Sequence, residues 1–298
     1  MIVNMTYTVM NAAPWNVLVP IYLFLLSISA GTIMITGGSR LLGGQIDQLW
    51  QRRAGYLSLV TLALAAFILL LDLHRPLRFW HLFNPANFNV NSPMAWGAWL
   101  LLFFGLALIF SLRPFTFHLS GSAGAETAAT GEGATHRSTL FIMFILSLLL
   151  AVYPGFELGV LQGKALWQSE ILPAYFLTTT FLAGLAVTML IGPGEGINVR
   201  ARGLMLGGII ASLVWIISRT LLLAAGGEAG ILALRTWWSN PFFYLGEILL
   251  GLILPMGLLL AAKKPDIARL KFAAILVLIG VFCMRYALLT AGNLAVLP

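Results

Sequence analysis

The chain has 298 residues, of which 60% are hydrophobic and only 9% are charged, and its formal net charge is +7. So few charged residues cannot make an ordinary water-soluble surface, which excludes a soluble globular protein. The composition therefore predicts an integral membrane protein.

Eight apolar runs follow one another along the chain, each long enough, at roughly 18 to 25 residues, to cross a hydrocarbon core as a helix. The first lacks the basic leader and small-residue cleavage site of a signal peptide, so we expect it to be retained. The predicted fold class is an all-α membrane protein with eight transmembrane helices. In chain order the runs are 16–38, 53–71, 94–112, 138–161, 171–191, 204–225, 242–262 and 272–293.

The longest connection, residues 113–137, is rich in Gly, Ala, Ser and Thr between Ser120 and Thr135. This composition predicts a flexible, solvated loop without a core of its own. No connection between the apolar runs is long enough for a soluble catalytic domain.

The basic residues are divided unequally between the two sides of the membrane. The connections after the first, third, fifth and seventh runs hold Arg40, Arg52, Arg53, Arg113, Arg137, Arg200, Arg202, Lys263, Lys264, Arg269 and Lys271. The other side holds Arg75, Arg78, Lys164 and Arg235. By the positive-inside rule the first set is cytoplasmic, so both termini face the opposite compartment. Because these charges are spread along a membrane face, they do not indicate nucleic-acid binding.

An internal repeat is predicted from the first and fifth runs, which share four residue types at a constant offset of 153, as from Pro20 to Pro173. The matched residues are Pro20, Tyr22, Ala30 and Gly31, and Pro173, Tyr175, Ala183 and Gly184. Coincidence between two apolar helices is the alternative. A real repeat would give two parallel four-helix bundles, residues 1–161 and 162–298, related by an axis along the membrane normal.

Polar residues within the runs share one layer near the non-cytoplasmic surface, roughly 10 to 14 Å deep at about 1.5 Å per helical residue. They are Tyr22, Asp72, Tyr153, Glu157, Arg219, Glu247 and Arg285. Buried Arg219 and Arg285 each need a carboxylate or carbonyl partner, and Glu247 is the natural partner for either. These three residues form either an ion network that only fixes helix packing or part of a proton path.

The segment Asp72-Leu73-His74-Arg75-Pro76 places three ionisable side chains at the end of the second run. Polar clusters at membrane depth are functional candidates. Asp72 and His74 are suited to moving protons at physiological pH, and Arg75 could keep Asp72 ionised. The alternative is an interfacial turn in which Pro76 ends the helix and the charges are simply solvated.

The sequence offers no ligand set for a redox centre. All four histidines, His74, His81, His118 and His136, fall in loops or at helix ends, whereas a transmembrane haem needs ligands that face one another across helices. Cys283 is the single cysteine, too few for an iron–sulfur cluster or a disulfide within the chain. We therefore expect no haem and no iron–sulfur cluster in this chain.

Short motifs occur in a fixed order along the whole chain. They are residues 20–25 (Pro-Ile-Tyr-Leu-Phe-Leu), residues 29–31 (Ser-Ala-Gly), the turn 74–76 (His-Arg-Pro) running into Phe79-Trp80, Tyr153 with Gly155, Gly251 to Pro255, Arg285-Tyr286 and residues 291–293 (Ala-Gly-Asn). This ordered set resembles the NrfD/PsrC family, the quinol-interacting membrane subunits of nitrite, polysulfide, thiosulfate and related respiratory complexes.

The resemblance implies two four-helix bundles in a bacterial or archaeal inner membrane. It implies a site for menaquinone or ubiquinone in the first bundle, at the non-cytoplasmic side. Beside that site it implies a docked ferredoxin-like iron–sulfur subunit, with a further catalytic subunit that carries molybdopterin or several haems. Tyr153 matches the family's tyrosine that hydrogen-bonds a quinone carbonyl, and Tyr22 stands where some members have a histidine.

Oxidation of a quinol releases two protons and two electrons, so its site needs a hydrogen-bond donor and a base. Tyr153 can supply the donor and either Asp72 or His74 the base, with Tyr22, Arg75 and Glu157 at the same depth. The chain is therefore predicted to exchange electrons between the quinone pool and the iron–sulfur subunit, and it is not a complete enzyme alone.

Two other classes of function stay open. A proton or ion transporter would spread polar residues through the whole membrane depth, whereas the cytoplasmic half here is nearly bare of them. The two functions combine if Arg219, Glu247 and Arg285 conduct protons coupled to quinone turnover. A bare membrane anchor for a peripheral enzyme is the third possibility.

Overall fold

The computed structural model describes residues 15–44, 48–73, 76–84, 92–112, 128–161, 164–192, 198–261 and 267–294. Every regular element in these ranges is a helix, and eight spans are long and apolar enough to cross a membrane, which confirms the predicted fold class. The elements are α2 (Leu18–Leu41), α3 (Gln48–Asp72), the 3₁₀ helix η1 (Pro76–Phe83), α4 (Pro93–Ser111), α5 (Ala128–Gly159), α6 (Leu172–Ile191), α7 (Asn198–Ala225), α8 (Gly227–Trp238), the π-helix η3 (Phe242–Ile253), α9 (Leu254–Ala261) and α10 (Ile267–Leu294).

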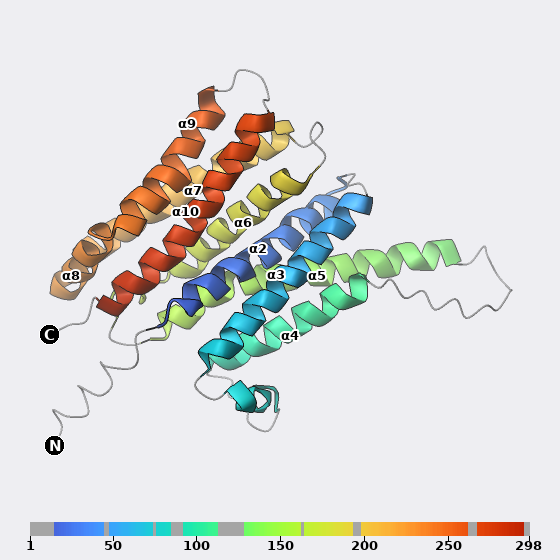
Figure 1. Ribbon diagram of the computed structural model, residues 1–298, viewed down its shortest axis with the longest axis horizontal. Helices are drawn as coiled ribbons and strands as arrows, with labels where there is room; N and C mark the ends of the chain where they lie inside the picture. The colour runs from blue at the N-terminus through green and yellow to red at the C-terminus, as the bar shows by residue number, and fades with distance from the viewer. Residues whose placement is uncertain are drawn as a thin grey trace.

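The spanning helices run side by side along one direction (Figure 1). Of their spans, α2, α6 and α10 are the most buried, and α4 is the least buried. The first turn of α2, the last turn of α10, α8 and η1 all lie at the same end of the molecule (Figure 1). We call this the terminal end.

The helices α2 and α6 approach each other backbone to backbone at Gly31 and Gly184. A Cβ atom on Gly31 would overlap the carbonyl oxygen of Thr180, and one on Gly184 would overlap the backbone of Gly31. Small residues permit such close crossings, which is how helices gain packing contacts in lipid. Equivalent positions of two copies can meet where a two-fold axis passes between them, so this contact is compatible with a repeat. The repeat and the division at residue 161 stay predictions.

Asn293 connects the two ends of the described residues. Its side chain accepts a hydrogen bond from the backbone of Trp15 and donates one to the carbonyl oxygen of the same residue, at 3.4 and 3.2 Å. The ring of Trp167 stacks on Trp15 and occupies the space beside Gly292, where any side chain would overlap it. The motif at residues 291–293 therefore has a packing role at the terminal end.

Several helices extend beyond the apolar runs. The helix α3 begins at Gln48 and α10 begins at Ile267, and basic residues stand in the added turns. Arg and Lys favour helices and lay their methylene stems along apolar surface while their charges reach the interface. The helix α5 begins at Ala128, so the prediction of a loop was wrong for residues 128–137, where alanines favour a helix despite the low hydropathy. Residues 113–127 lie outside the described ranges.

The connection between α7 and α9 contains a short helix that the hydropathy pattern did not indicate. Gly227, at φ +68°, reverses the chain after α7, and α8 then buries Ala233 and Trp237 while Arg235 stays exposed. With 12 residues and a charged face, α8 is too short to span the membrane. Its character is that of a helix lying in the interface.

Candidate functional site

Four polar residues from three helices lie together at the terminal end. Tyr22 comes from the first turns of α2, Asp72 is the last residue of α3, and Tyr153 and Glu157 lie one turn apart on α5. We call them the tyrosine–carboxylate cluster. Tyr22 and Tyr153 are buried, and the two acidic residues are half-buried.

Glu157 is the centre of the cluster. The hydroxyl group of Tyr22 donates a hydrogen bond to its carboxyl oxygen Oε2 at 3.2 Å, and Tyr153 lies close enough to Glu157 to interact with it electrostatically. Asp72 lies close enough to Tyr22 to interact with it electrostatically. A carboxyl group at this depth is tolerated because the Tyr22 phenol satisfies one of its oxygens. The structure thus brings together all four described residues that we predicted for the quinone site.

Proline and glycine shape α5 around the cluster. Pro154 lies inside the helix, where it cannot donate the usual backbone hydrogen bond, and such positions bend a helix. A Cβ atom on Gly155 would overlap the backbone of Pro173, so α5 and the start of α6 are in close contact here. These two residues fix the direction in which Tyr153 and Glu157 leave the helix.

Gly97 of α4 belongs to the site although the sequence analysis did not select it. A Cβ atom on Gly97 would overlap the end of the Tyr153 ring, including its hydroxyl oxygen. A single glycine in an apolar helix carries no signal of this kind, because only the packing of α4 on α5 shows what faces it. Gly97 provides the space that the phenol group occupies.

The remaining predicted residues are placed as follows. His74 and Arg75 lie outside the described residues. In the described part of the chain no group of three or more His, Cys, Asp and Glu side chains could hold a metal ion. Cys283 is buried with a free thiol.

Arg285 of α10 is held inside the bundle by three oxygen atoms. Its Nε donates to the carbonyl oxygen of Leu23 at 3.2 Å, Nη1 to that of Val281 at 3.0 Å, and Nη2 to the hydroxyl oxygen of Thr180 at 3.3 Å. Its positive charge also acts on Glu247. The bond to Leu23 joins α10 to α2 one residue after Tyr22.

Arg219 has different partners. It donates from Nη2 to the carbonyl oxygen of Leu166, and its guanidinium group lies 4.9 Å from the ring centre of Trp237. Glu247 makes no ion pair with either arginine among the described residues: it interacts with Arg285 only electrostatically, and Arg219 is held by a carbonyl group and an aromatic face. Such contacts stabilise a buried cation without a carboxylate.

The fold and the cluster define an eight-helix, multi-pass membrane protein with buried phenol and carboxyl groups at one end. The profile of the family described as "Polysulphide reductase, NrfD" matches residues 5–297. The chain belongs to this family, which confirms the resemblance.

Individual relatives match over nearly their whole length. The C chain of polysulfide reductase from Wolinella succinogenes is 28% identical, over 95% of this protein and 95% of the relative. The protein NrfD homolog of Haemophilus influenzae is 28% identical, again over 95% of both sequences. Protein NrfD of Escherichia coli is 27% identical, over 95% of this protein and 96% of its own length.

Proposed function

We propose that the chain is the membrane subunit of a respiratory reductase and exchanges electrons between the quinone pool and a docked iron–sulfur subunit. Family membership supports a membrane role in such a complex, because one relative is the C chain of a polysulfide reductase. The observation that carries the proposal is the carboxyl group of Glu157, which accepts a hydrogen bond from Tyr22 and lies near Tyr153 and Asp72 at one end of the membrane-spanning bundle.

The residues of the cluster fit a quinone by their chemistry. A quinone, when bound, supplies two-electron, two-proton redox chemistry, and its carbonyl oxygens need hydrogen-bond donors. Tyr22 and Tyr153 are such donors, and each phenol oxygen can also accept a bond. Glu157 and Asp72 are the bases within the same group of residues. The glycine at position 97 keeps the end of Tyr153 clear of any α4 side chain.

We assign the roles by position. Tyr153 holds a ring oxygen of the substrate by donating its single hydroxyl hydrogen to it, and Glu157 accepts the hydroxyl hydrogen of Tyr22. Asp72, half-buried at the end of α3, takes the proton and passes it toward the non-cytoplasmic side. His74 and Arg75 are the proposed proton acceptor and charge partner in the same turn.

Electrons then reach or leave a ferredoxin-like iron–sulfur subunit docked at the terminal end. A further catalytic subunit, with molybdopterin or several haems, completes the complex. We place the chain in a bacterial or archaeal inner membrane with both termini on the non-cytoplasmic side, and menaquinone or ubiquinone is the substrate. The asymmetry of basic residues in the sequence supports this orientation.

The test is Tyr153→Phe in the assembled complex, measured as the rate of iron–sulfur reduction by quinol. Loss of the hydroxyl group removes one donor without changing the ring, so we expect the rate to fall by about tenfold or more. Tyr175→Phe is the matched control, because Tyr175 is also buried but its hydroxyl group has no hydrogen-bond partner among the described residues. Unchanged activity in Tyr153→Phe would favour a bare membrane anchor.

An ion transporter is the competing function. It predicts ion flux into liposomes by the chain alone, without redox partners. Flux of that kind, together with an iron–sulfur absorption spectrum in the complex that does not respond to quinol, would overturn the proposed function.

A further inference from the structure

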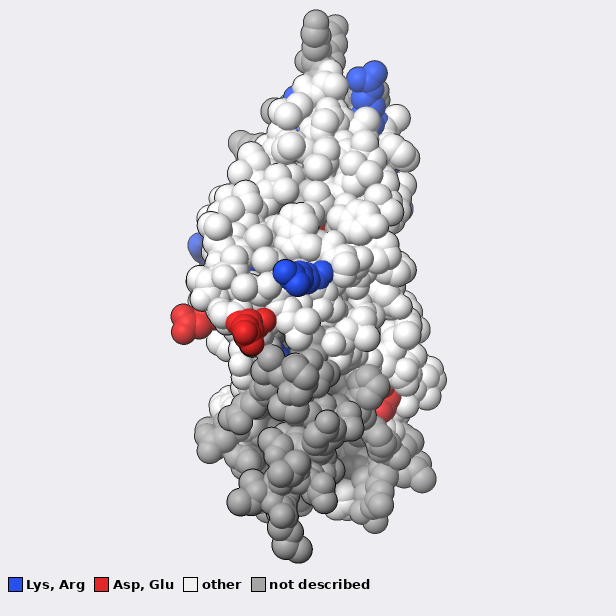
Figure 2. Space-filling model, turned by 90° about the vertical axis from the view of Figure 1, so that its left-hand side faces the viewer, with Lys and Arg blue, Asp and Glu red and all other residues white. Residues whose placement is uncertain are grey.

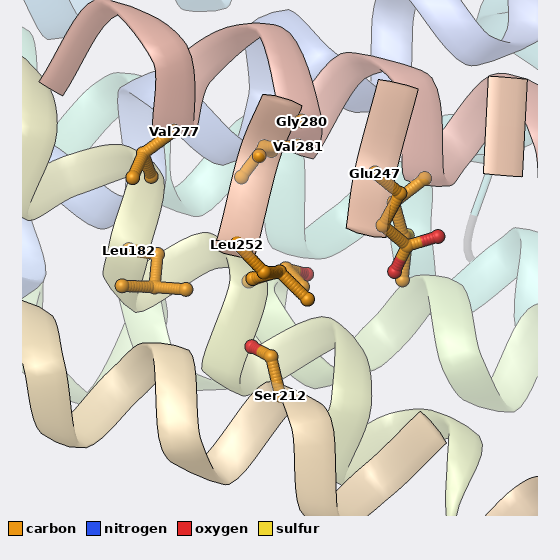
Figure 3. A pocket seen from close by; sticks show the side chains of 10 residues that line it. Leu182, Ser212, Glu247, Leu252, Val277, Gly280 and Val281 are labelled. Atoms are coloured by element: carbon orange, nitrogen blue, oxygen red, sulfur yellow. The ribbon is translucent and has the colours of Figure 1, made fainter. Parts of the chain in front are cut away.

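A small cavity lies in the other half of the bundle, between α6, α7, η3 and α10 (Figure 3). Its volume is about 10 Å³, counted as the space open to the centre of a water-sized sphere. That is close to the space that one buried water molecule requires. Its polar lining comes from Thr179, Ser212 and Glu247, and apolar residues such as Leu182, Leu252 and Val281 form the rest.

Glu247 lines this cavity and has an unpaired carboxyl oxygen. Its side chain is 3% exposed, and its Oε2 atom has no hydrogen-bond partner among the described residues. Figure 3 shows the Ser212 side chain extending from α7 toward Leu252, with the Glu247 side chain on the other side of Leu252. A buried carboxyl oxygen without a partner is costly, so it requires a ligand that can hydrogen-bond with it.

The two hydroxyl groups in the lining are prepared to accept hydrogen bonds. Ser212 donates its hydrogen to the carbonyl oxygen of Gly208 at 2.9 Å, and Thr179 donates to that of Tyr175 at 3.0 Å. Each hydroxyl oxygen therefore keeps lone pairs but no free hydrogen. A water molecule in the cavity can donate to these oxygens and exchange a hydrogen bond with Glu247, which gives it the two to four partners that a buried water needs.

The backbone that carries Glu247 is unusual. The segment η3 is a π-helix over 12 residues. Turns of π-helix are rare in proteins, but those that occur are often at functional sites. Gly251 of η3 meets Gly280 of α10 so closely that a Cβ atom on either would overlap the other's backbone. Pro255 follows shortly afterwards and cannot donate a backbone hydrogen bond. Glu247 therefore lies in a π-helical segment and not in a regular α-helix.

The charged and titratable groups that act on Glu247 come from α10. They are the guanidinium group of Arg285 and the thiol of Cys283. The elements α6 and α7 contribute the neutral hydroxyl groups of Thr179 and Ser212. A carboxyl group that faces one cation and a water site can exist with or without its proton, because the cation stabilises one form and burial the other.

We propose that Glu247 and this cavity form a proton-exchanging water site. The carboxyl group binds a water molecule together with Ser212 and Thr179, and a proton moves between the carboxyl oxygen and that water: the carboxylic acid and water give carboxylate and hydronium, and the reverse. The proposal is independent of the quinone site, since it needs no residue of the tyrosine–carboxylate cluster.

The test is infrared difference spectroscopy of the full chain in its native complex, recorded on pH change in H₂O and in D₂O. We expect a carboxylic-acid carbonyl band that shifts to lower frequency in D₂O and is missing in Glu247→Gln. Superimposable wild-type and Glu247→Gln spectra would overturn the proposal, and so would a Glu247 band that does not respond to D₂O.

Two further variants separate a water site from a merely protonated carboxyl group. Ser212→Ala removes an acceptor of the water, so the Glu247 band should change frequency. Ser147→Ala is the matched control, because Ser147 is buried and bonds its own helix in the same way. An unchanged band in Ser212→Ala would refute the water site. If Glu247→Gln does not assemble, comparison of the band in wild type, Ser212→Ala and Ser147→Ala gives the same decision.

Discussion

Tyr153 owes its position to the absence of a side chain on the neighbouring helix. Its ring and hydroxyl group fill the space beside Gly97, and Glu157 lies close enough to interact with it electrostatically. A rigid aromatic group that is closely packed keeps a fixed orientation, which is what a substrate-positioning residue needs. The geometry of the cluster is therefore determined as much by α4 as by the two helices that supply its hydrogen bond.

Gly97→Ala should separate this positioning role from general stability. The added methyl group overlaps the Tyr153 ring, so the phenol must move away from Glu157, and we expect quinol-dependent activity to fall by about tenfold or more. Gly105→Ala on the same helix is the control, because its Cβ atom would meet only Leu62 at 3.4 Å. Equal activity of the two variants would contradict the role assigned to Gly97.

At the scale of helices, the glycine crossing between α2 and α6 makes a second prediction. Gly31→Ala forces two backbones apart, and overpacking of this kind costs about 1–3 kcal/mol, so the variant should unfold at a lower denaturant concentration. Gly207→Ala on α7 has no atom within 4 Å of the new Cβ and gains helix propensity, so it should unfold at or slightly above the wild-type midpoint. Denaturant titration of the purified protein, followed by circular dichroism, measures both. A Gly31→Ala variant as stable as Gly207→Ala would contradict the close crossing.

The sequence predicts the helices better than their contacts. Long apolar runs identify the eight spans because a helix that crosses the membrane must be both long and apolar. The helix α8 was not identified because it is amphipathic and has only 12 residues. The sequence does not indicate that η3 is a π-helix, because this mostly apolar segment has no polar stripe whose spacing would distinguish a π-helix from an α-helix. The shared depth of Tyr22 and Glu157 follows from topology, but their hydrogen bond depends on how α2 and α5 are rotated, which only packing decides.

At the scale of the whole molecule, α2, α3 and α5 supply the tyrosine–carboxylate cluster, α6, α7, η3 and α10 line the Glu247 cavity, and α2 and α10 are in contact. Arg285 takes part in that contact, because it bonds the Leu23 carbonyl group of α2 and its charge acts on Glu247. Among the described residues of the face in Figure 2, the few charged side chains lie apart from one another.

The orientation of the molecule gives the last prediction. The proposed quinone site opens toward the non-cytoplasmic side only if the terminal end faces that compartment, as the basic residues of the other end favour. Alkaline phosphatase, which is active only outside the cytoplasm, should be active when fused after the last residue of the chain. It should be inactive when fused after Gly192, at the end of α6. A fluorescent protein that becomes fluorescent only in the cytoplasm should show the reverse pattern. Activity of the phosphatase at Gly192 and not at the C-terminus would show that the orientation is the opposite one, with the tyrosine–carboxylate cluster on the cytoplasmic side.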